Sequence, residues 1–510
     1  MVKKSSFVLG IIVAVFACTI QAAEKPDLPS LQELTEARAR LDSNDAHRPR
    51  FHFTPPQNWM NDPNGLIQYK GVYHLFYQHN PWDAVWGNMH WGHATSLDLV
   101  HWADRPIALP PTPGTFDEGG CFSGCAVVND DGLPTFVYTG VLEHDSVNNY
   151  RPQSQGIAVS HDGLETFKKH PDNPLIPLPP SDFETKDFRD PCVWKDGDWW
   201  YNVIGSGEIG GAGKALLYRS RDLVEWEYLN PILTGDPEES GRIWECPSFF
   251  PLGDKHILMV SPIPGHKVSY FVGDFDGRKF TPDSFQVFDY GSSYAPQTFV
   301  DEQGRRLLFG WIREDRRGEL HDAAGWAGAM SLPQELTLNA NGKLNIAPVG
   351  EVKALRRNQK NWAMKTLTPN SGNLLADVSG NALEIWLDIE PGDAEKITLS
   401  FYQTPDGAEQ THLVYDVKTK TLGFDRSQSS LQDGVGKHLH ETKIDLGDNE
   451  HLLLNLFLDR SVVELFANQN TYLATRVYPT KYDAQGMSIS VQGGSAKVNL
   501  LSVWEMQSGM

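Results

Sequence analysis

The chain has 510 residues, which is enough for two or more domains with large cores. It carries 44 Lys and Arg against 65 Asp and Glu, a net charge of −21, so nucleic acids and anionic membranes are poor partners. The five cysteines show no paired Cys-x-x-Cys or Cys/His spacing, so neither a metal site nor a cofactor is expected.

Residues 1–22 are predicted to form a secretory signal. Lys3 and Lys4 precede the apolar run "FVLGIIVAVFA", which is too short to span a bilayer, and the small residues of "TIQAA" follow it. The protein is therefore expected to be exported, to the periplasm or the medium. Cys18 leaves a lipid anchor open as an alternative, which the bulky Phe16 two residues earlier disfavours. No other stretch reads as membrane-spanning, and residues 23–47 form an N-terminal segment.

Residues 48–340 are rich in short apolar runs with a strand-like pattern, and one unit recurs among them. "GHATSLDLVHW", "GIAVSHDGLETF", "LLYRSRDLVEW" and "YFVGDFDGRKF" each join a strand, a Ser/Asp or Gly/Asp turn and an aromatic residue. The copies are about 50–65 residues apart, the length of a β-propeller blade, with room for one more copy. The alternative is that such strand–turn–strand units recur by chance in any all-β protein.

The sequence pattern changes near residue 340, where the repeated unit ends. Residues 341–360 are predicted to be a linker, in which "EVKALRRNQ" forms a short helical connector. Residues 361–510 contain alternating strands without a repeat, such as "ALEIWLDI" and "HLLLNLFLD", which predict a β-sandwich. Asp459 and Glu464 in this part are interpreted as ordinary strand-end and cross-strand charges.

Three acidic residues of the first domain lie among strands and aromatic residues. They are Asp62 in "WMNDPNG", Asp190 in "FRDP" and Glu245 in "WECP". Taken singly, each is more typical of a surface turn or an ion-paired turn. Together they fit different blades, whose innermost strands converge on one axis. Arg189 supplies a cation beside Asp190, and Trp244 is expected to form part of an apolar wall.

These motifs also carry a resemblance to a known family. From "HFTPPQNWMNDPNG" to "LDRSVVELFAN" (458–468), the chain resembles glycoside hydrolase family 32, which contains invertases, inulinases and levanases. The resemblance implies an all-β fold, a five-bladed β-propeller followed by a β-sandwich. It also implies that Asp62 is the nucleophile, Glu245 the general acid/base and Asp190 a third acid that holds the fructose hydroxyls.

The resemblance further implies which residues line the sugar pocket: Asn61, Gln78, Trp86, Phe122, Ser123, Arg189, Tyr294 and Trp311. Three positions depart from the common family pattern. Ser292-Ser293 stands where many relatives have Asp-Phe, Ser248 replaces a common Asp, and Gln334 stands where Arg is usual. We expect all three around the rim of the pocket or just behind it, where they affect leaving-group preference rather than the class of reaction.

The leading interpretation is a retaining, exo-acting β-fructofuranosidase that hydrolyses sucrose and short fructo-oligosaccharides. A fructosyltransferase or a fructanase on the same scaffold is an alternative, and a non-catalytic carbohydrate-binding propeller is a remote one. The His90 and His93 pair is not expected to bind metal, because residues three apart on a strand point to opposite faces. Cys246 is interpreted as a packed free thiol. The sequence leaves the oligomeric state open.

Overall fold

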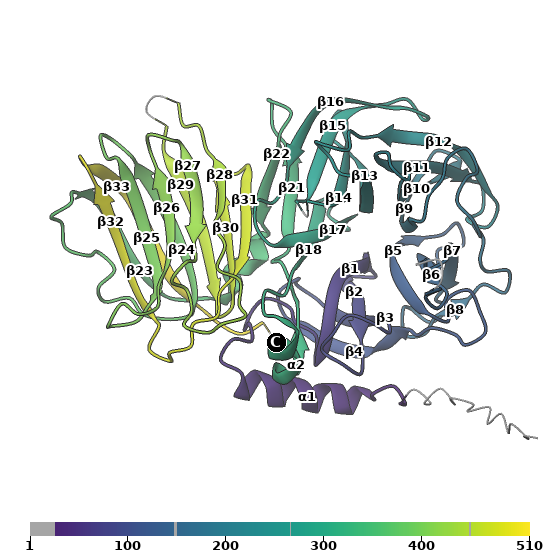
Figure 1. The fold of residues 1–510 in the computed structure, drawn as a ribbon, viewed down its shortest axis with the longest axis horizontal. Coiled ribbons are helices and arrows are strands. Elements are labelled where there is room, and N and C mark those ends of the chain that lie inside the picture. Colours follow the sequence, from purple (N-terminus) through teal and green to yellow (C-terminus); the bar gives the residue numbers. More distant parts are fainter. Residues whose placement is uncertain (1–25, 147–149, 266, 448–449, 510) are drawn as a thin grey trace, which may run out of the picture.

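The computed structural model describes residues 26–146, 150–265, 267–447 and 450–509 (Figure 1). The predicted signal sequence and Cys18 lie outside these ranges. Within them, no helix is long and apolar enough to cross a membrane. The prediction of a mostly β chain is confirmed, since strands make up most of the ordered elements.

One helix precedes the sheets, in the N-terminal segment where the sequence predicted no regular element. Helix α1 (Leu31–Asn44) begins with a capping box, in which the Ser30 hydroxyl accepts from the Glu33 N–H and the Glu33 carboxylate accepts from the Ser30 N–H. Arg38 of this helix pairs with Asp104 at 2.5 Å and so fixes α1 against the first sheet.

Five antiparallel sheets follow one another along the chain, each built mainly from strands that are consecutive in sequence. Within the last sheet, between Ile312 and Gln334, the chain forms three short elements: α2 (Gly318–Ala324), β19 (Trp326–Ala327) and β20 (Ala329–Met330). Here the chain returns to the first sheet, because β19 pairs in parallel with β1. The five sheets are β1 (Asn58–Tyr69), β2 (Val72–Asn80), β3 (His90–Ser96) and β4 (Trp102–Leu109); β5 (Gly120–Val128), β6 (Pro134–Val141), β7 (Gln153–Val159) and β8 (Lys168–Lys169); β9 (Phe188–Asp196), β10 (Trp199–Gly207), β11 (Gly213–Ser220) and β12 (Trp226–Thr234); β13 (Ile243–Leu252), β14 (Lys255–Ile263), β15 (Ser269–Phe275) and β16 (Phe280–Val287); β17 (Ser293–Val300), β18 (Arg306–Ile312), β21 (Gln334–Leu338) and β22 (Leu344–Pro348).

The first strands of the five sheets form a closed cycle. Strand β1 contacts β5, β5 contacts β9, β9 contacts β13, β13 contacts β17, and β17 contacts β1 again. Figure 1 shows the sheets standing around a common centre. Residues far apart in sequence therefore meet wherever they occupy equivalent places on these first strands.

The repeat seen in the sequence corresponds to the turn between the third and fourth strands of a sheet. In the first sheet Leu99 adopts a left-handed conformation (φ 67°), and the Trp102 indole N–H donates to its carbonyl at 2.9 Å. Leu223 and Trp226 repeat this arrangement in the third sheet, with φ 67° and 3.0 Å. The repeat is therefore a shared turn geometry rather than chance.

The C-terminal part consists of two sheets that pack face to face. Their inner side chains, among them Ile385, Leu456, Leu399 and Ile489, form one apolar core. The six-stranded sheet contains β23 (Arg356–Leu367), β33 (Ala496–Met506), β24 (Ala382–Glu390), β29 (Leu452–Asp459), β30 (Val462–Ala467) and β31 (Thr471–Arg476); the five-stranded sheet contains β28 (His440–Lys443), β27 (Thr421–Asp425), β26 (Thr411–Asp416), β25 (Lys396–Gln403) and β32 (Gly486–Gln492).

The structure places the boundary between the two parts differently from the predicted linker at 341–360. Strand β22 (Leu344–Pro348) pairs with β21, so "LNANGKLNIAPVG" is a hairpin of the fifth sheet. Only the 3₁₀ helix η1 (Gly350–Leu355) connects the parts, and β23 begins at once at Arg356. The Asn-Gly-Lys turn therefore joins two paired strands and does not begin a linker.

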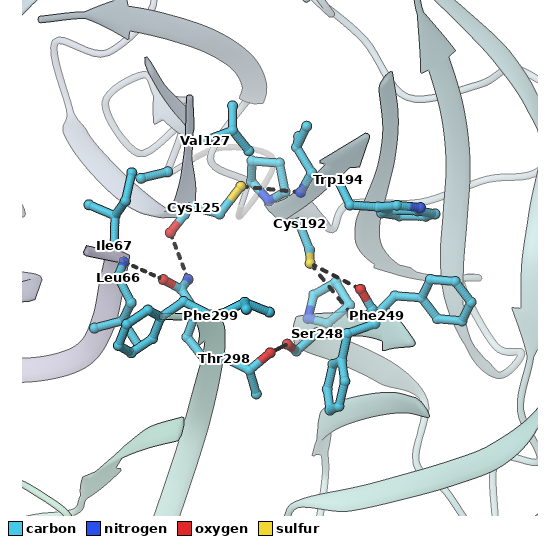
Figure 2. A pocket seen from close by; sticks show the side chains of 18 of the residues that line it. Leu66, Ile67, Cys125, Val127, Cys192, Trp194, Ser248, Phe249, Thr298 and Phe299 are labelled. Atoms are coloured by element: carbon cyan, nitrogen blue, oxygen red, sulfur yellow. Dashed lines mark hydrogen bonds between the residues drawn. The ribbon is translucent and has the colours of Figure 1, made fainter. Parts of the chain in front are cut away.

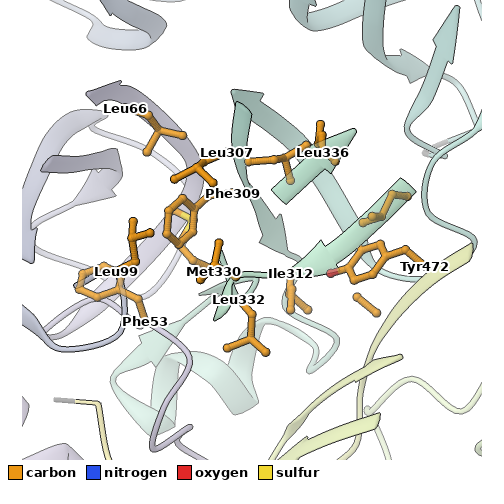
Figure 3. Close-up of a cluster of buried hydrophobic side chains, with 14 of the residues drawn as sticks. Phe53, Leu66, Leu99, Leu307, Phe309, Ile312, Met330, Leu332, Leu336 and Tyr472 are labelled. Carbon is orange, nitrogen blue, oxygen red and sulfur yellow. The ribbon is translucent and has the colours of Figure 1, made fainter. Parts of the chain in front are cut away.

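The two parts share a hydrophobic core. Tyr472 and Phe466 of the six-stranded sheet belong to the same buried cluster as Ile312 and Leu336 of the fifth sheet and Leu332 just before β21. Figure 3 shows Tyr472 beside Ile312. The sheets of the C-terminal part are thus fixed to the sheets that carry the candidate site.

A buried ionic cluster lies at the same junction, and we call His52, Asp459, Glu464 and Tyr472 the junction cluster. The His52 ring lies 2.9 Å from Asp459 Oδ2 through Nδ1 and 2.6 Å from Glu464 Oε2 through Nε2. Tyr472 donates its hydroxyl to the other Glu464 oxygen. The interpretation of Asp459 and Glu464 as ordinary strand charges is therefore wrong, because both side chains are fully buried and hold the segment that leads into β1.

Candidate active site

Each first strand is interrupted by a β-bulge at the same level. A bulge re-aims the side chains around it and bends the strand. In four of the five strands the bulged residue is followed by Pro, which has no N–H to leave unpaired, and in the fifth by Gly. The bulges lie between Met60 and Pro63, Cys121 and Gly124, Arg189 and Cys192, Glu245 and Ser248, and Tyr294 and Gln297.

Asp62 lies in the bulge of β1 and is held by neutral donors. The Ser123 hydroxyl donates to Asp62 Oδ2 at 2.6 Å, and the Asn61 amide donates to Oδ1 at 3.0 Å. Trp59 in turn orients Asn61 by donating its indole N–H to the amide oxygen at 2.7 Å. Burial raises the pKa of Asp62 against these hydrogen bonds, and the charge of Glu245 adds to the increase.

Glu245 lies in the bulge of β13 and faces a cation and a phenol. Arg189 donates to Glu245 Oε1 from Nη2 at 2.8 Å and from Nε at 3.2 Å. Tyr294 donates its hydroxyl to Oε2 at 2.6 Å. Asp187 holds the far side of the Arg189 guanidinium at 2.5 Å. The two carboxylates, Asp62 and Glu245, are therefore kept in different surroundings.

Asp190 completes the group from the bulge of β9. Its backbone is left-handed (φ 64°), which is strained for a residue with a side chain, and its N–H donates to Thr139 Oγ1 at 2.9 Å. Burial raises the pKa of Asp190 to about 7; Arg189 opposes this shift, and the carboxylates of Glu245 and Asp62 add to it. The structure thus brings all three predicted acids together.

Cys246 is a contact that the sequence interpretation missed. Its thiol lies 3.4 Å from Asp62 Oδ2 and 3.5 Å from Asp190 Oδ2, and its N–H donates to Asp190 Oδ2 at 2.9 Å. It is a packed free thiol, as predicted, since it lies against the main apolar core, but its sulfur also contacts two carboxylates. The signal was present in the series N-D-P, F-S-G, R-D-P, E-C-P and Y-A-P, which places Asp62, Ser123, Asp190, Cys246 and Ala295 at equivalent positions.

Aromatic side chains form two walls beside the carboxylates. Phe122 and the half-exposed Trp86 lie edge to face with ring centroids 5.8 Å apart, and Arg151 lies over both rings. On the other side Trp311 contacts Tyr294, with centroids 6.4 Å apart. The predicted aromatic residues are therefore near the acids, and Arg151 is an addition that no sequence motif indicated.

The structure gives the surroundings of three other predicted features. Gln78 is buried and donates to the Cys121 carbonyl at 3.0 Å, so it supports the strand behind Ser123. Trp244 alternates with Glu245 on β13 and packs into the core of the third and fourth sheets, so it does not wall the pocket. The departures from the family pattern are all buried, which agrees with a place behind the pocket and not with one at its rim: Ser248, Ser292, Ser293 and Gln334.

The histidines near the site are held by protein groups. His93 Nε2 lies 3.0 Å from His74 Nδ1, and His90 Nδ1 lies 2.6 Å from the Asn88 carbonyl. In the part of the chain that the structure describes, no three His, Cys, Asp or Glu side chains are grouped so that they could hold a metal ion.

Comparisons with known proteins agree with this geometry. The family model described as "Glycosyl hydrolases family 32 N-terminal domain" matches residues 52–348, and the corresponding C-terminal model matches residues 351–505. A sucrose-6-phosphate hydrolase of Zymomonas mobilis is 37% identical over 474 residues, covering 87% of this chain and 90% of that protein.

Solved structures give the same result. A fructan 1-exohydrolase IIa from Cichorium intybus in complex with 1-kestose has a TM-score of 0.81 at 28% identity, covering 91% of this chain and 98% of that one. A β-fructofuranosidase mutant from Bombyx mori in complex with sucrose has a TM-score of 0.77 at 31% identity, covering 94% and 98%. The chain belongs to glycosyl hydrolase family 32.

Proposed function

We propose that the protein is a retaining, exo-acting β-fructofuranosidase that hydrolyses terminal β-D-fructofuranosides of sucrose and short fructo-oligosaccharides. One observation carries the proposal. Asp62, Asp190 and Glu245 come from three different first strands and meet in one group, with neutral donors on Asp62 and a cation and a phenol on Glu245. Two carboxyl groups in different surroundings are what a glycosidase needs for its two roles.

The architecture fits this proposal. We infer that the five sheets are the blades of a β-propeller and that its axis runs along the cycle of first strands. The five matched bulges then bring one or two side chains from every blade to the same level of the axis. A site at the end of such an axis admits the end of a sugar chain, which supports exo-action.

In the first half of the reaction, an Asp62 oxygen forms a bond to C2 of the fructosyl unit. The bond from C2 to the leaving oxygen breaks, and Glu245 gives its proton to that oxygen. Ser123 and Asn61 keep the Asp62 carboxylate in place for this attack. Asp190 binds ring hydroxyls and stabilises the positive charge that develops on the sugar ring.

In the second half, Glu245 takes a proton from water. The water oxygen attacks C2, and the bond between C2 and Asp62 breaks, which returns both carboxyl groups to their starting states. Arg189 and Tyr294 hold Glu245 through both steps, while Trp86, Phe122 and Trp311 shield the sugar from bulk water.

The experiment that tests this function is a time course on sucrose, short fructo-oligosaccharides, inulin and levan, with products separated by chain length. We expect free fructose as the first product and kcat/KM to fall in that order of substrates. Early internal fragments would contradict exo-action. Oligosaccharides longer than the substrate, formed at high sucrose concentration, would favour a fructosyltransferase.

We also propose that the protein is exported, because residues 1–22 have the composition of a signal sequence. Cell fractionation followed by N-terminal sequencing tests this directly. An intact N-terminus in the cytoplasm would contradict the proposal, and a mature chain that begins at Cys18 would indicate the lipid-anchored alternative.

A further inference from the structure

A cavity adjoins the candidate active site. It has a volume of 440 Å³ and is lined by residues of all five first strands (Figure 2). The residues that follow the five bulges all contribute to its wall: Pro63, Gly124, Pro191, Pro247 and Pro296. The cavity shares Ser123, Asp190 and Cys246 with the candidate active site, but the mechanism proposed above uses no other side chain of its lining, so the rest of the cavity needs its own explanation.

The charges around the cavity are unbalanced. Its lining contains one carboxylate, Asp190, which is engaged by Cys246, and two cations, Lys195 and Arg306. Lys195 is paired with Asp130. Arg306 has no ion pair anywhere in the described ranges of the chain. A half-buried cation without a counter-charge is unfavourable unless a bound group compensates it.

Arg306 is poorly satisfied in its hydrogen bonds as well. Its Nη1 donates to Thr298 Oγ1 at a long 3.4 Å, and its guanidinium lies 4.7 Å from the centre of the Phe250 ring. Its buried Nε has no partner among the residues that the structure describes. Burial lowers the pKa of Arg306 to about 10, so the group is still a cation at neutral pH.

Two hydroxyl groups stand next to this cation. Ser248 Oγ lies 3.1 Å from Thr298 Oγ1, the atom that Arg306 contacts (Figure 2). Ser248 is also one of the positions where the resemblance to the family implies a common Asp. The chain therefore offers a guanidinium and two hydroxyls at a place where it supplies no carboxylate of its own.

We propose that this cavity is a binding site for a small carboxylate anion, of the size of formate or acetate. The carboxylate accepts charge-assisted hydrogen bonds from Arg306 and hydrogen bonds from Ser248 and Thr298. The thiols of Cys125 and Cys192, which also face the cavity, do not repel an anion, because burial raises the pKa of both and keeps them neutral. The anion stabilises the folded protein and takes no part in the hydrolysis.

The test uses sodium formate as the probe and three variants. In a zwitterionic buffer, formate should raise the Tm of the wild-type protein in a saturable way, by about 1–2 °C at ten times the Kd. Saturation-transfer NMR of the formate proton should show binding over the same concentration range. Arg306→Gln should abolish both responses.

Ser248→Asp is the sharper variant, because it supplies a carboxylate beside Arg306. It should raise the Tm in the absence of formate and remove the response to formate. Lys195→Gln is the matched control: it removes the other cation of the cavity, and its formate response should equal that of the wild type. Sucrose hydrolysis, which none of these residues serves, reports that each variant is folded.

Equal responses to formate in the wild type, Arg306→Gln and Ser248→Asp would overturn the proposal. So would a saturable response to sodium chloride that formate does not reproduce, which would indicate a halide site. Because binding is measured without turnover, a failure of this proposal is distinguishable from a failure of the proposed enzymatic function.

Discussion

The candidate active site and the junction cluster are both buried and ionic, but they differ in charge balance. In the active site one cation, Arg189, serves several carboxylates, Glu245 and Asp187 directly and Asp190 at 3.9 Å. In the junction cluster one histidine, His52, lies between two carboxylates, and backbone N–H groups of residues 50–52 and Leu332 complete their coordination.

This difference shows in the pKa values. Burial opposes protonation of His52, but hydrogen bonds to Asp459 and Glu464 outweigh it and raise the pKa of His52 to about 9. In the active site burial wins, and it raises the pKa of Asp190 to about 7. A cluster whose charges are paired and hydrogen-bonded stabilises the fold. A cluster with more carboxylates than cations keeps ionisable groups whose protons and charges can take part in a reaction. Substitutions at four positions test this distinction.

The largest effect is expected at the nucleophile. Asp62→Asn keeps the shape and the Ser123 contact but removes the anion, so kcat on sucrose should fall by about 10⁴-fold. The melting temperature should not fall, because no stabilising charge is lost. Steady-state kinetics and thermal unfolding measure both. A folded Asp62→Asn variant with near-native turnover would refute the assignment.

The next effect separates the acid from the nucleophile. Glu245→Ala should lower kcat/KM on sucrose by about 10²–10⁴-fold, because the leaving sugar needs a proton. It should slow release of the aryl alcohol far less for an aryl fructoside whose leaving group is stable as an anion. Equal losses on the two substrates would mean that Glu245 does not protonate the leaving group.

The junction cluster should affect stability rather than chemistry. His52→Ala leaves two buried carboxylates without a cation and should lower the free energy of unfolding by about 3–5 kcal/mol, with little change in KM. His47→Ala is the matched control, since this partly buried histidine contacts the Pro479 carbonyl at 2.8 Å and lies 3.9 Å from a single carboxylate, Asp45. A His52→Ala variant as stable as the control would show that the cluster is dispensable.

The pH dependence of this effect has a definite sign. The folded pKa of about 9 is above the usual value of 6.5, so the contribution of His52 is complete below about pH 6.5 and is lost as the pH rises through 9. Denaturant unfolding between pH 6 and 10 should show a decline in the wild type that is absent in His52→Gln.

The smallest effect is a gain. The folded pKa of Asp190, about 7, is above its unfolded value, so its ionised form destabilises the protein increasingly as the pH rises from about 4 to 7. Asp190→Asn should therefore stabilise the protein by about 1–3 kcal/mol at pH 8 and leave stability unchanged at pH 4. Burial also raises the pKa of Asp289 to about 7. Asp289 is present in both proteins, so its contribution cancels when the free energy of unfolding of the wild type is subtracted from that of the variant. An equal gain at both pH values would contradict the role of the charge.

Sequence reasoning located the acids because they lie in long ordered motifs, and it located the repeat because each copy has the same turn chemistry. It missed Cys246, because the short series that aligns this residue with Asp62 and Asp190 has a meaning only once the five segments are known to be equivalent bulged strands. It also misread Asp459 and Glu464. The alternation of polar and apolar residues along a strand predicts the face of the sheet on which a side chain lies. It does not predict that residues 50–52 cover that face.

The buried departures from the family pattern show a similar limit. Ser248 is expected around the rim of the pocket or just behind it, and the bulge after Glu245 sends the chain along the cavity wall. Only the three-dimensional structure shows that Ser248 lies beside Thr298, whose hydroxyl Arg306 contacts.

The most direct test of the central claim is to trap the covalent intermediate. Glu245→Ala should form the fructosyl-enzyme from an activated aryl fructoside and hydrolyse it slowly, because no base activates water. Rapid quenching, digestion and mass spectrometry should find one fructosyl unit on the peptide that contains Asp62, and none in the Glu245→Ala, Asp62→Asn double variant. A fructosyl unit on another residue, or an intermediate that forms without Asp62, would contradict the account.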